Sequence, residues 1–235
     1  MLFKRFLFIF LFFLINIPLF AQGSEQGNHS DVIRGEVFVD FEPIYAGHVD
    51  GDYPLDTQTA GRRALEEAAL FFSAMIYGWS FYYEAGERAR QISENLELSP
   101  VSEIQFGDPA LRVTETQIRD MSLWVWADYH LSDAQRSRMR MWRTGNFRNA
   151  QAVGHSPSFI EEYPGWLIYK KMALEDAARA AIRAMLRSTE RNRPKEATGF
   201  ISLASFPRYY IDEGRWTASA RFRVQINEII PFAAY

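Results

Sequence analysis

The amino-acid sequence predicts an α+β fold in which helices pack on antiparallel sheets. Two long segments carry apolar residues at helical spacing, and several others alternate apolar with polar residues as strands do. The chain has 235 residues, of which 48% are hydrophobic and 23% are charged. This composition supplies a hydrophobic core and excludes a disordered tail, a collagen-like repeat and a solvated linker.

The first predicted elements are a strand and a long helix. Apolar residues alternate on one face of residues 32–46, which predicts a strand. Residues 60–92 place apolar side chains in the i, i+4, i+7 rhythm of a helix. Since residues 68–83 carry no charge, we expect this helix to be buried on nearly every side. The uncharged stretch is shorter than a membrane span.

The middle of the chain predicts a strand, a short helix and a boundary. Residues 121–131 alternate strictly and predict a half-buried strand, and residues 134–142 predict a short basic helix. Residues 144–165 are punctuated by Gly, Asn, Ser and Pro, which indicates a linker. An acidic lobe would then span residues 22–143 and a basic lobe residues 166–235; the alternative is that both form one domain.

The last third of the chain predicts a second strong helix at residues 166–191. Two strands follow at residues 198–211 and 215–226, joined by the turn signal Asp212-Glu213-Gly214. A helix and a final hairpin therefore close the predicted fold.

Two helix segments resemble one another. Residues 64–69 and 173–178 are identical at five of six positions, and each helix is followed by strands that end in a long alternating one. The order helix, strand, strand thus occurs twice. Because Ala, Leu and Glu are the commonest helix formers, an internal repeat and a coincidence both remain open.

The amino-terminal residues 1–21 predict a secretory signal peptide. Lys4 and Arg5 precede the apolar run 6–15, and the cleavage is expected after Ala21. A polar residue and a proline interrupt the run, which disfavours an uncleaved membrane anchor. We expect an exported protein, periplasmic or secreted, that is not an integral membrane protein after cleavage. Without cysteine, the chain has no lipid-anchor site, disulfide or thiolate chemistry.

Charge is distributed unevenly along the chain. Residues 22–133 contain 20 acidic and 7 basic side chains, whereas residues 134–235 contain 9 acidic and 17 basic ones. Such polarity predicts a protein partner, or a homo-oligomer held by opposed faces, and suits an anionic envelope polymer better than nucleic acid. A solvated face with ordinary ion pairs is the alternative. The expected contact residues are Arg136, Arg138, Arg140, Arg143, Arg179, Arg183, Arg187 and Arg191.

The sequence lacks the common catalytic motifs. It contains no phosphate-binding glycine loop, dinucleotide fingerprint, HExxH zinc pair or GxSxG nucleophile elbow. The four histidines have no spacing that places two on one face of an element, so no metal site is predicted. We therefore expect no cofactor, and a non-catalytic role is favoured over an enzyme.

One strand face is the best candidate for a ligand site. Trp124, Trp126, Asp128 and His130 alternate with the apolar residues of the strand at 121–131, so they share its outer face. The tryptophans would stack on a sugar ring or another flat ligand, and Asp128 would orient His130 as a general base. A face covered by a helix or a partner produces the same pattern.

The second half of the chain carries a family resemblance. An alanine-spaced helix leads into an alternating hairpin that ends at residues 221–224. The alanines are Ala173, Ala177, Ala181 and Ala184. This pattern resembles the FlgT amino-terminal type of module found in exported bacterial flagellar and envelope lipoproteins. The resemblance implies a structural or assembly role in the envelope and no catalytic residues, and the missing lipid-anchor cysteine departs from the lipoprotein members.

Together these observations predict a non-catalytic exported envelope protein that acts as an assembly, scaffold or adaptor subunit. The motility apparatus is one setting that the resemblance implies. The alternative is a carbohydrate-binding or ligand-binding periplasmic protein, with glycan hydrolysis as an extension, that uses the face from Trp124 to His130.

Overall fold

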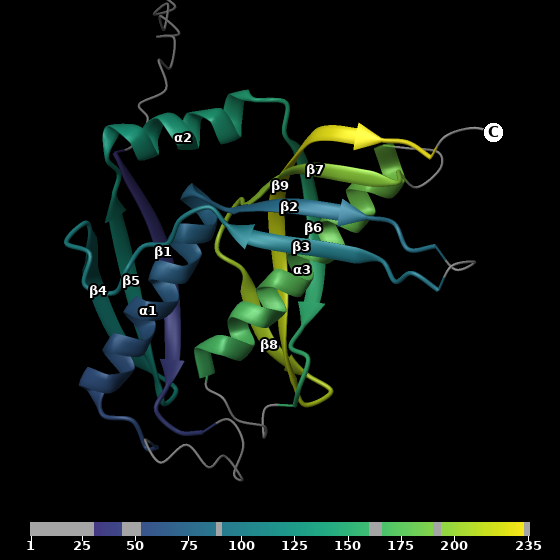
Figure 1. Ribbon diagram of the computed structural model, residues 1–235. Helices are drawn as coiled ribbons and strands as arrows, with labels where there is room; N and C mark the ends of the chain where they lie inside the picture. Colours follow the sequence, from purple (N-terminus) through teal and green to yellow (C-terminus); the bar gives the residue numbers. More distant parts are fainter. Residues whose placement is uncertain (1–30, 44–52, 88–90, 160–165, 190–193, 233–235) are drawn as a thin grey trace, which may run out of the picture.

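The computed structural model describes residues 31–43, 53–87, 91–159, 166–189 and 194–232. These residues form helices and antiparallel sheets, which confirms the α+β class (Figure 1). The predicted signal peptide, its cleavage position after Ala21 and Arg191 lie outside the described residues.

The strands form two sheets in which every pairing is antiparallel. Sheet A has the order β1 (Val32–Asp40), β5 (Ser122–His130), β4 (Leu111–Arg119). Sheet B has the order β3 (Asn95–Pro100), β2 (Trp79–Glu84), β7 (Glu196–Leu203), β9 (Arg215–Ile230), β6 (Arg148–His155), with β8 (Arg208–Asp212) paired to β9.

Helix α1 (Thr57–Ile76) connects the two sheets. Its Phe72 ring lies 5.8 Å from the ring of Tyr129 in β5, and its Phe71 ring stacks 5.7 Å from that of Tyr209 in β8. One buried hydrophobic cluster includes residues of both sheets and of the helices. The expectation of a helix buried on nearly every side is therefore confirmed for residues 67–76 of α1, whereas its first turns carry exposed side chains.

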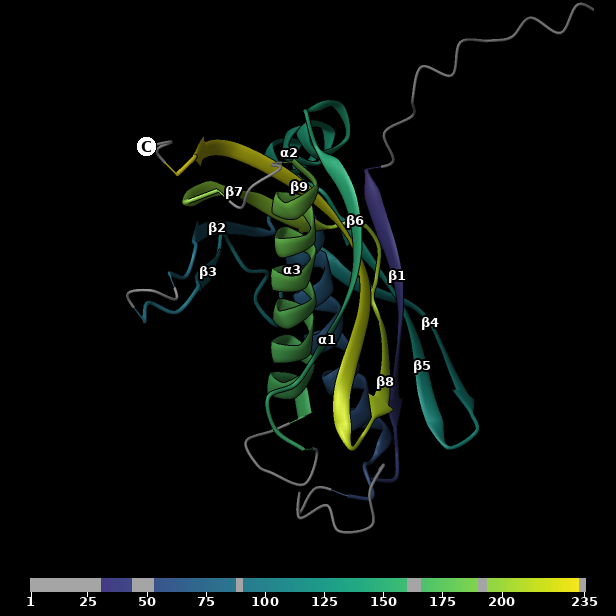
Figure 2. The same cartoon turned by 90° about the vertical axis from the view of Figure 1, so that its right-hand side faces the viewer.

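Helix α3 (Trp166–Thr189) runs along β6 and β9 of sheet B (Figure 2). Close approach is possible because small residues meet there. A Cβ atom at Gly154 of β6 would lie 2.0 Å from the backbone nitrogen of Ala177 and 2.6 Å from the carbonyl oxygen of Ala173. The alanine spacing of this helix thus serves backbone-to-backbone packing.

Helix α2 (Asp133–Thr144) lies at one end of the molecule (Figure 1). A capping box between Ser132 and Gln135 begins it. Its Trp142 donates a hydrogen bond from Nε1 to the carbonyl oxygen of Ile76, at 2.9 Å, so α2 satisfies one of the last carbonyl groups of α1.

The helix predicted over residues 60–92 is wrong in its second part. The helix ends at Ile76, and Trp79–Glu84 form β2. Gly78 adopts φ +64°, and a Cβ atom there would lie 2.2 Å from the carbonyl oxygen of Ile201. The chain turns at this glycine because only glycine allows both the conformation and the approach.

The predicted linker at residues 144–165 is also corrected, because it contains strand β6. This strand is rich in small residues, which resemble a loop in the sequence but fit beneath α3. The two expected lobes share sheet B, since β2 pairs with β7. The single strand predicted at residues 198–211 is two strands, β7 and β8, whereas β5, α2, α3 and β9 lie where the sequence patterns place them.

The topology repeats. In sheet A, β5 lies between β1 and β4; in sheet B, β9 lies between β6 and β7. Each set therefore contains a strand, a helix and a later pair of strands, β4 and β5 or β7 and β9, of which the last pairs with the first. The second set has the short strand β8 in addition. The similar segments begin at Ala64, seven residues after Thr57, and at Ala173, seven residues after Trp166. This equivalence favours a duplication over a coincidence, with the β2–β3 hairpin as an insertion.

Substitution by alanine is predicted to have opposite effects at Gly154, which packs against α3, and at Gly61 in α1. Gly154→Ala is expected to destabilise the protein by about 1–3 kcal/mol, because the methyl group overlaps the backbone of α3. Gly61→Ala is expected to stabilise it by about 0.5–1 kcal/mol, because the nearest side-chain atom, in Leu123, is 4.0 Å away and alanine favours a helix. Urea unfolding followed by circular dichroism measures both. An unchanged midpoint for Gly154→Ala would contradict the packing.

Candidate functional site

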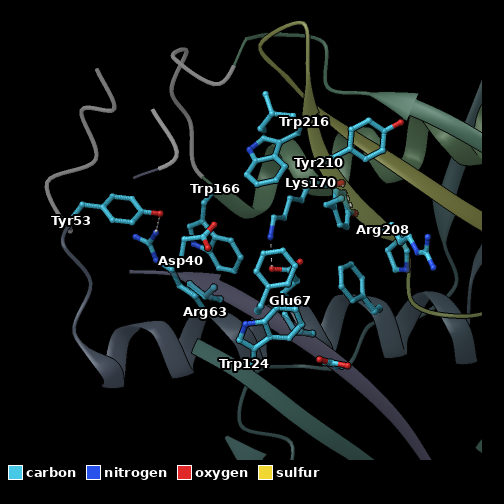
Figure 3. Close-up of a pocket in the computed structure, with 18 residues that line it drawn as sticks. Asp40, Tyr53, Arg63, Glu67, Trp124, Trp166, Lys170, Arg208, Tyr210 and Trp216 are labelled. Atoms are coloured by element: carbon cyan, nitrogen blue, oxygen red, sulfur yellow. Dashed lines mark hydrogen bonds and ion pairs between the residues drawn. The ribbon is translucent and has the colours of Figure 1, made fainter. Parts of the chain in front are cut away.

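A pocket of about 630 Å³ lies among β1, α1, the first turns of α3, and the β8–β9 hairpin (Figure 3). Its volume falls within the range of about 300–1,000 Å³ that is typical of small-molecule sites. Eight aromatic side chains line it: Phe38, Tyr53, Phe71, Trp124, Trp166, Tyr209, Tyr210 and Trp216. Large aromatic surfaces with a few charged groups therefore define its chemistry.

A buried ion pair stands at the centre of the pocket. The Nζ atom of Lys170, in α3, lies 2.7 Å from Oε2 of Glu67, in α1 (Figure 3). Both side chains are buried. Burial raises the pKa of the Glu67 carboxyl above its ordinary value, and the positive charge of Lys170 opposes this shift. The pair joins the two long helices.

Three aromatic rings surround the Lys170 ammonium. Its Nζ atom lies 4.9 Å from the ring centroid of Trp216, 5.5 Å from that of Tyr209 and 5.8 Å from that of Trp166. The faces of these rings attract the cation and shield it from water. Tyr209 also donates a hydrogen bond from its hydroxyl to the carbonyl oxygen of Lys170, at 2.8 Å. Burial, together with the charge of Glu67, raises the pKa of Tyr209 well above its ordinary value.

Arg63 lies at the other end of the pocket and comes from the same stripe of α1 as Glu67. Its guanidinium carbon lies 5.3 Å from the centroid of the Tyr53 ring and 5.6 Å from that of Trp166. Its Nη1 atom donates a hydrogen bond to the Tyr53 hydroxyl, at 3.3 Å. The arginine is thereby held between two aromatic side chains.

The wall formed by sheet A contains one of the predicted site residues. Trp124 lines the pocket and stacks on Phe38 of β1, with ring centroids 4.9 Å apart. Trp126, one repeat further along the strand, is outside the pocket lining. Arg119 of β4 lies over both tryptophans, 5.6 Å from Trp124 and 5.3 Å from Trp126. The two tryptophans share a strand face, as predicted, but only one faces the pocket.

The other two predicted ligand residues are elsewhere. The Asp128 carboxylate accepts hydrogen bonds from Nε of Arg34, at 3.0 Å, and from its Nη2, at 3.1 Å. These residues are cross-strand partners in β1 and β5. His130, at the end of β5, is exposed, and none of the hydrogen bonds among the described residues joins it to Asp128. The structure pairs Asp128 with Arg34, and the role of Asp128 in orienting His130 stays a prediction.

Several arginines expected to contact a partner are ion-paired within the chain. These pairs join Arg136 to Asp31 and Asp133, Arg179 to Glu175, and Arg183 to Glu94. The other described arginines of the set form no ion pair with a described residue: Arg138, Arg140, Arg143 and Arg187. The set is thus divided between α2 and α3, and its role in contacting a partner stays a prediction.

The sequence patterns missed most of the pocket. Its central residues come from four separate elements, and no local spacing relates them. The available signals were Glu67 next to the charge-free residues 68–83, and Lys170 directly after the uncharged residues 166–169 of α3. A charge on the buried side of a helix indicates a partner, but the sequence does not identify that partner.

The comparisons with other proteins place the chain in a family. A protein-family model, of a domain of unknown function, matches residues 21–232. The chain belongs to this family. It is also 24% identical over 224 residues to an uncharacterized protein of Treponema pallidum (strain Nichols), an alignment that covers 88% of this chain and 91% of that protein. No solved structure matches the chain.

The described residues contain neither a cluster of metal-binding side chains nor a helix suited to crossing a membrane. Within the described residues, no group of three or more His, Asp or Glu side chains is arranged to hold a metal ion. The helices of the same residues include none with the length and apolar character needed to cross a membrane.

The buried pair predicts a strongly non-additive set of variants. Lys170→Met is expected to destabilise the protein by about 3–5 kcal/mol, because it leaves the Glu67 carboxyl buried without its partner. The double variant Glu67→Leu/Lys170→Met is expected to recover most of this loss, because it removes both charges. Urea unfolding at neutral pH measures both values. Equal losses in the single and double variants would contradict this account.

The same pair predicts a pH dependence. Folding raises the pKa of the Glu67 carboxyl, so the folded protein binds the carboxyl proton more tightly than the unfolded chain does. The free energy of unfolding should therefore decrease as the pH rises above the ordinary glutamate pKa of 4.5, and decrease more steeply in Lys170→Met. Unfolding between about pH 4 and pH 8 tests this. The control is Glu67→Gln/Lys170→Met, which has no carboxyl at residue 67 and should not show the steeper decrease. Identical slopes of unfolding free energy against pH in Lys170→Met and in this control would argue against the prediction.

Proposed function

We propose that this protein is a non-catalytic, exported binding protein of the cell envelope whose aromatic pocket holds a neutral glycan segment. The observation that carries the proposal is the lining of the pocket. Its acidic residues are Glu36, Asp40 and Glu67, and its basic residues are Arg63, Lys170 and Arg208. The equal numbers of the two charges favour a ligand without net charge.

The aromatic side chains supply the second part of the argument. Rings that present their faces to a pocket stack on the apolar face of a sugar, while carboxylates and guanidinium groups bond its hydroxyls. Trp124 and Phe38 form such a surface at the rim, where Phe38 is 41% exposed. Tyr210, on the opposite wall, is 44% exposed. A flat ring entering the pocket would thus meet aromatic surfaces on two sides.

The titratable groups of the pocket favour binding over catalysis. Glu67 and Lys170 are paired with each other, and the Tyr209 hydroxyl donates a hydrogen bond to the carbonyl oxygen of Lys170. Groups held in this way stiffen a site but do not exchange protons readily with a substrate. The pocket is therefore better suited to orienting a ligand than to cleaving it.

The proposal of export is supported by the signal-like residues 1–21, and the family match begins at residue 21. The assembly role, and the motility setting implied by the resemblance to FlgT-type modules, stay predictions. Three of the arginines that would carry assembly form ion pairs within the chain.

Two tryptophans on one strand provide a matched test. Trp124→Ala is expected to weaken glycan binding about tenfold, equivalent to about 1.4 kcal/mol, because it removes a ring that faces the pocket. Trp126→Ala, on the same face but outside the pocket, should leave the affinity unchanged. Calorimetric titration with cellotetraose and with chitotetraose, a neutral N-acetylated sugar, measures this. Absence of binding to both sugars in the wild-type protein, or equal losses in both variants, would refute the proposal.

A further inference from the structure

A second cleft, of about 530 Å³, lies on the face of sheet B opposite α3. Gly154 of β6 contacts α3. Asn149 and Gln151 lie an odd number of residues from Gly154 in the same strand, so their side chains point to the other face of the sheet, away from that helix. Their cross-strand partners are Arg223 and Arg221 of β9. The cleft is lined by Asn149, Ala150, Gln151, Ala204, Ser205, Arg221 and Arg223.

Arg223 is half-buried in this cleft and incompletely bonded. Its Nη2 atom donates one long hydrogen bond, of 3.5 Å, to the carbonyl oxygen of Ala204. Its Nη1 atom is buried and has no hydrogen-bond partner in the protein. The same holds for Oγ of Ser202, the residue opposite Arg223 in β7. Buried donors of this kind are unfavourable unless they are hydrogen-bonded.

Positive charge in the cleft is not compensated. No acidic side chain lines it. Arg143, Arg221 and Arg223 form no ion pair with any described residue. Burial, and after it the positive charge of Arg143 in α2, lowers the pKa of Arg223 below the ordinary arginine value. In this respect the cleft differs from the aromatic pocket, where the charges balance.

We propose that this cleft binds the diphosphate group of a soluble ligand, with Arg223 and Arg221 as its charged donors and Asn149, Gln151 and Ser205 as neutral ones. The planar guanidinium group bonds phosphoryl oxygens in pairs. Two residues at alternate positions on one strand face are about 7 Å apart, which allows each arginine to hold one phosphoryl group. The Nη1 atom of Arg223 would then gain its missing acceptor.

Calorimetric titration of the purified protein with inorganic pyrophosphate at low salt tests the site. Arg223→Gln is expected to weaken binding at least tenfold, and Arg221→Gln to weaken it severalfold. Arg112→Gln is the matched control, because it removes the same charge from an exposed position in β4 of sheet A. It should leave the affinity unchanged. If Arg223→Gln fails to fold, the exposed Arg221 carries the test.

Three results would overturn the proposal. The first is no pyrophosphate binding by the wild-type protein; binding to phosphatidylglycerol vesicles in its place would assign the cleft to a membrane surface. The second is an equal loss of affinity in the Arg112 control. The third is citrate binding as tight as pyrophosphate binding, which would assign the cleft to carboxylates. Trp124→Ala should bind pyrophosphate normally, so this outcome is independent of the glycan proposal.

Discussion

The second half of helix α1, residues 68–76, has apolar side chains on almost every side, and such a segment is stable in water only when other elements cover it. Sheet A covers it through contacts such as that of Phe72 with Tyr129, and the β8 side of sheet B covers it through Phe71 and Tyr209. The remaining stripe carries Arg63 and Glu67. The aromatic pocket exists because this charged stripe cannot be packed in the same way.

The ion pair of Glu67 with Lys170 is a consequence of that arrangement. A carboxylate buried alone beside α1 would be strongly unfavourable, so α3 supplies the compensating cation and the rings of Trp166 and Trp216 surround it. The ion pair therefore joins the two helices at the pocket that both of them line.

The aromatic pocket and the arginine-lined cleft on sheet B differ in electrostatic character for a topological reason. The aromatic pocket lies between elements of both halves, so acidic residues of the first half face basic residues of the second. The cleft that contains Arg221 and Arg223 lies on sheet B among elements from the second half of the chain alone, where most of the charged side chains are arginines. The relative from Treponema pallidum covers both halves, and family membership carries the fold but not the ligand.

Local patterns in the sequence determined the fold class, the alternating strands β5 and β9, the helix α3, and the shared face of Trp124 and Trp126, because each depends on spacing along one element. Tertiary structure decided where α1 ends, since Gly78 turns against Ile201 in a strand more than a hundred residues away. It also decided that Asp128 bonds Arg34 and that Glu67 meets Lys170. The partners in these contacts are far apart in the chain, and only the packed sheets and helices bring them within bonding distance.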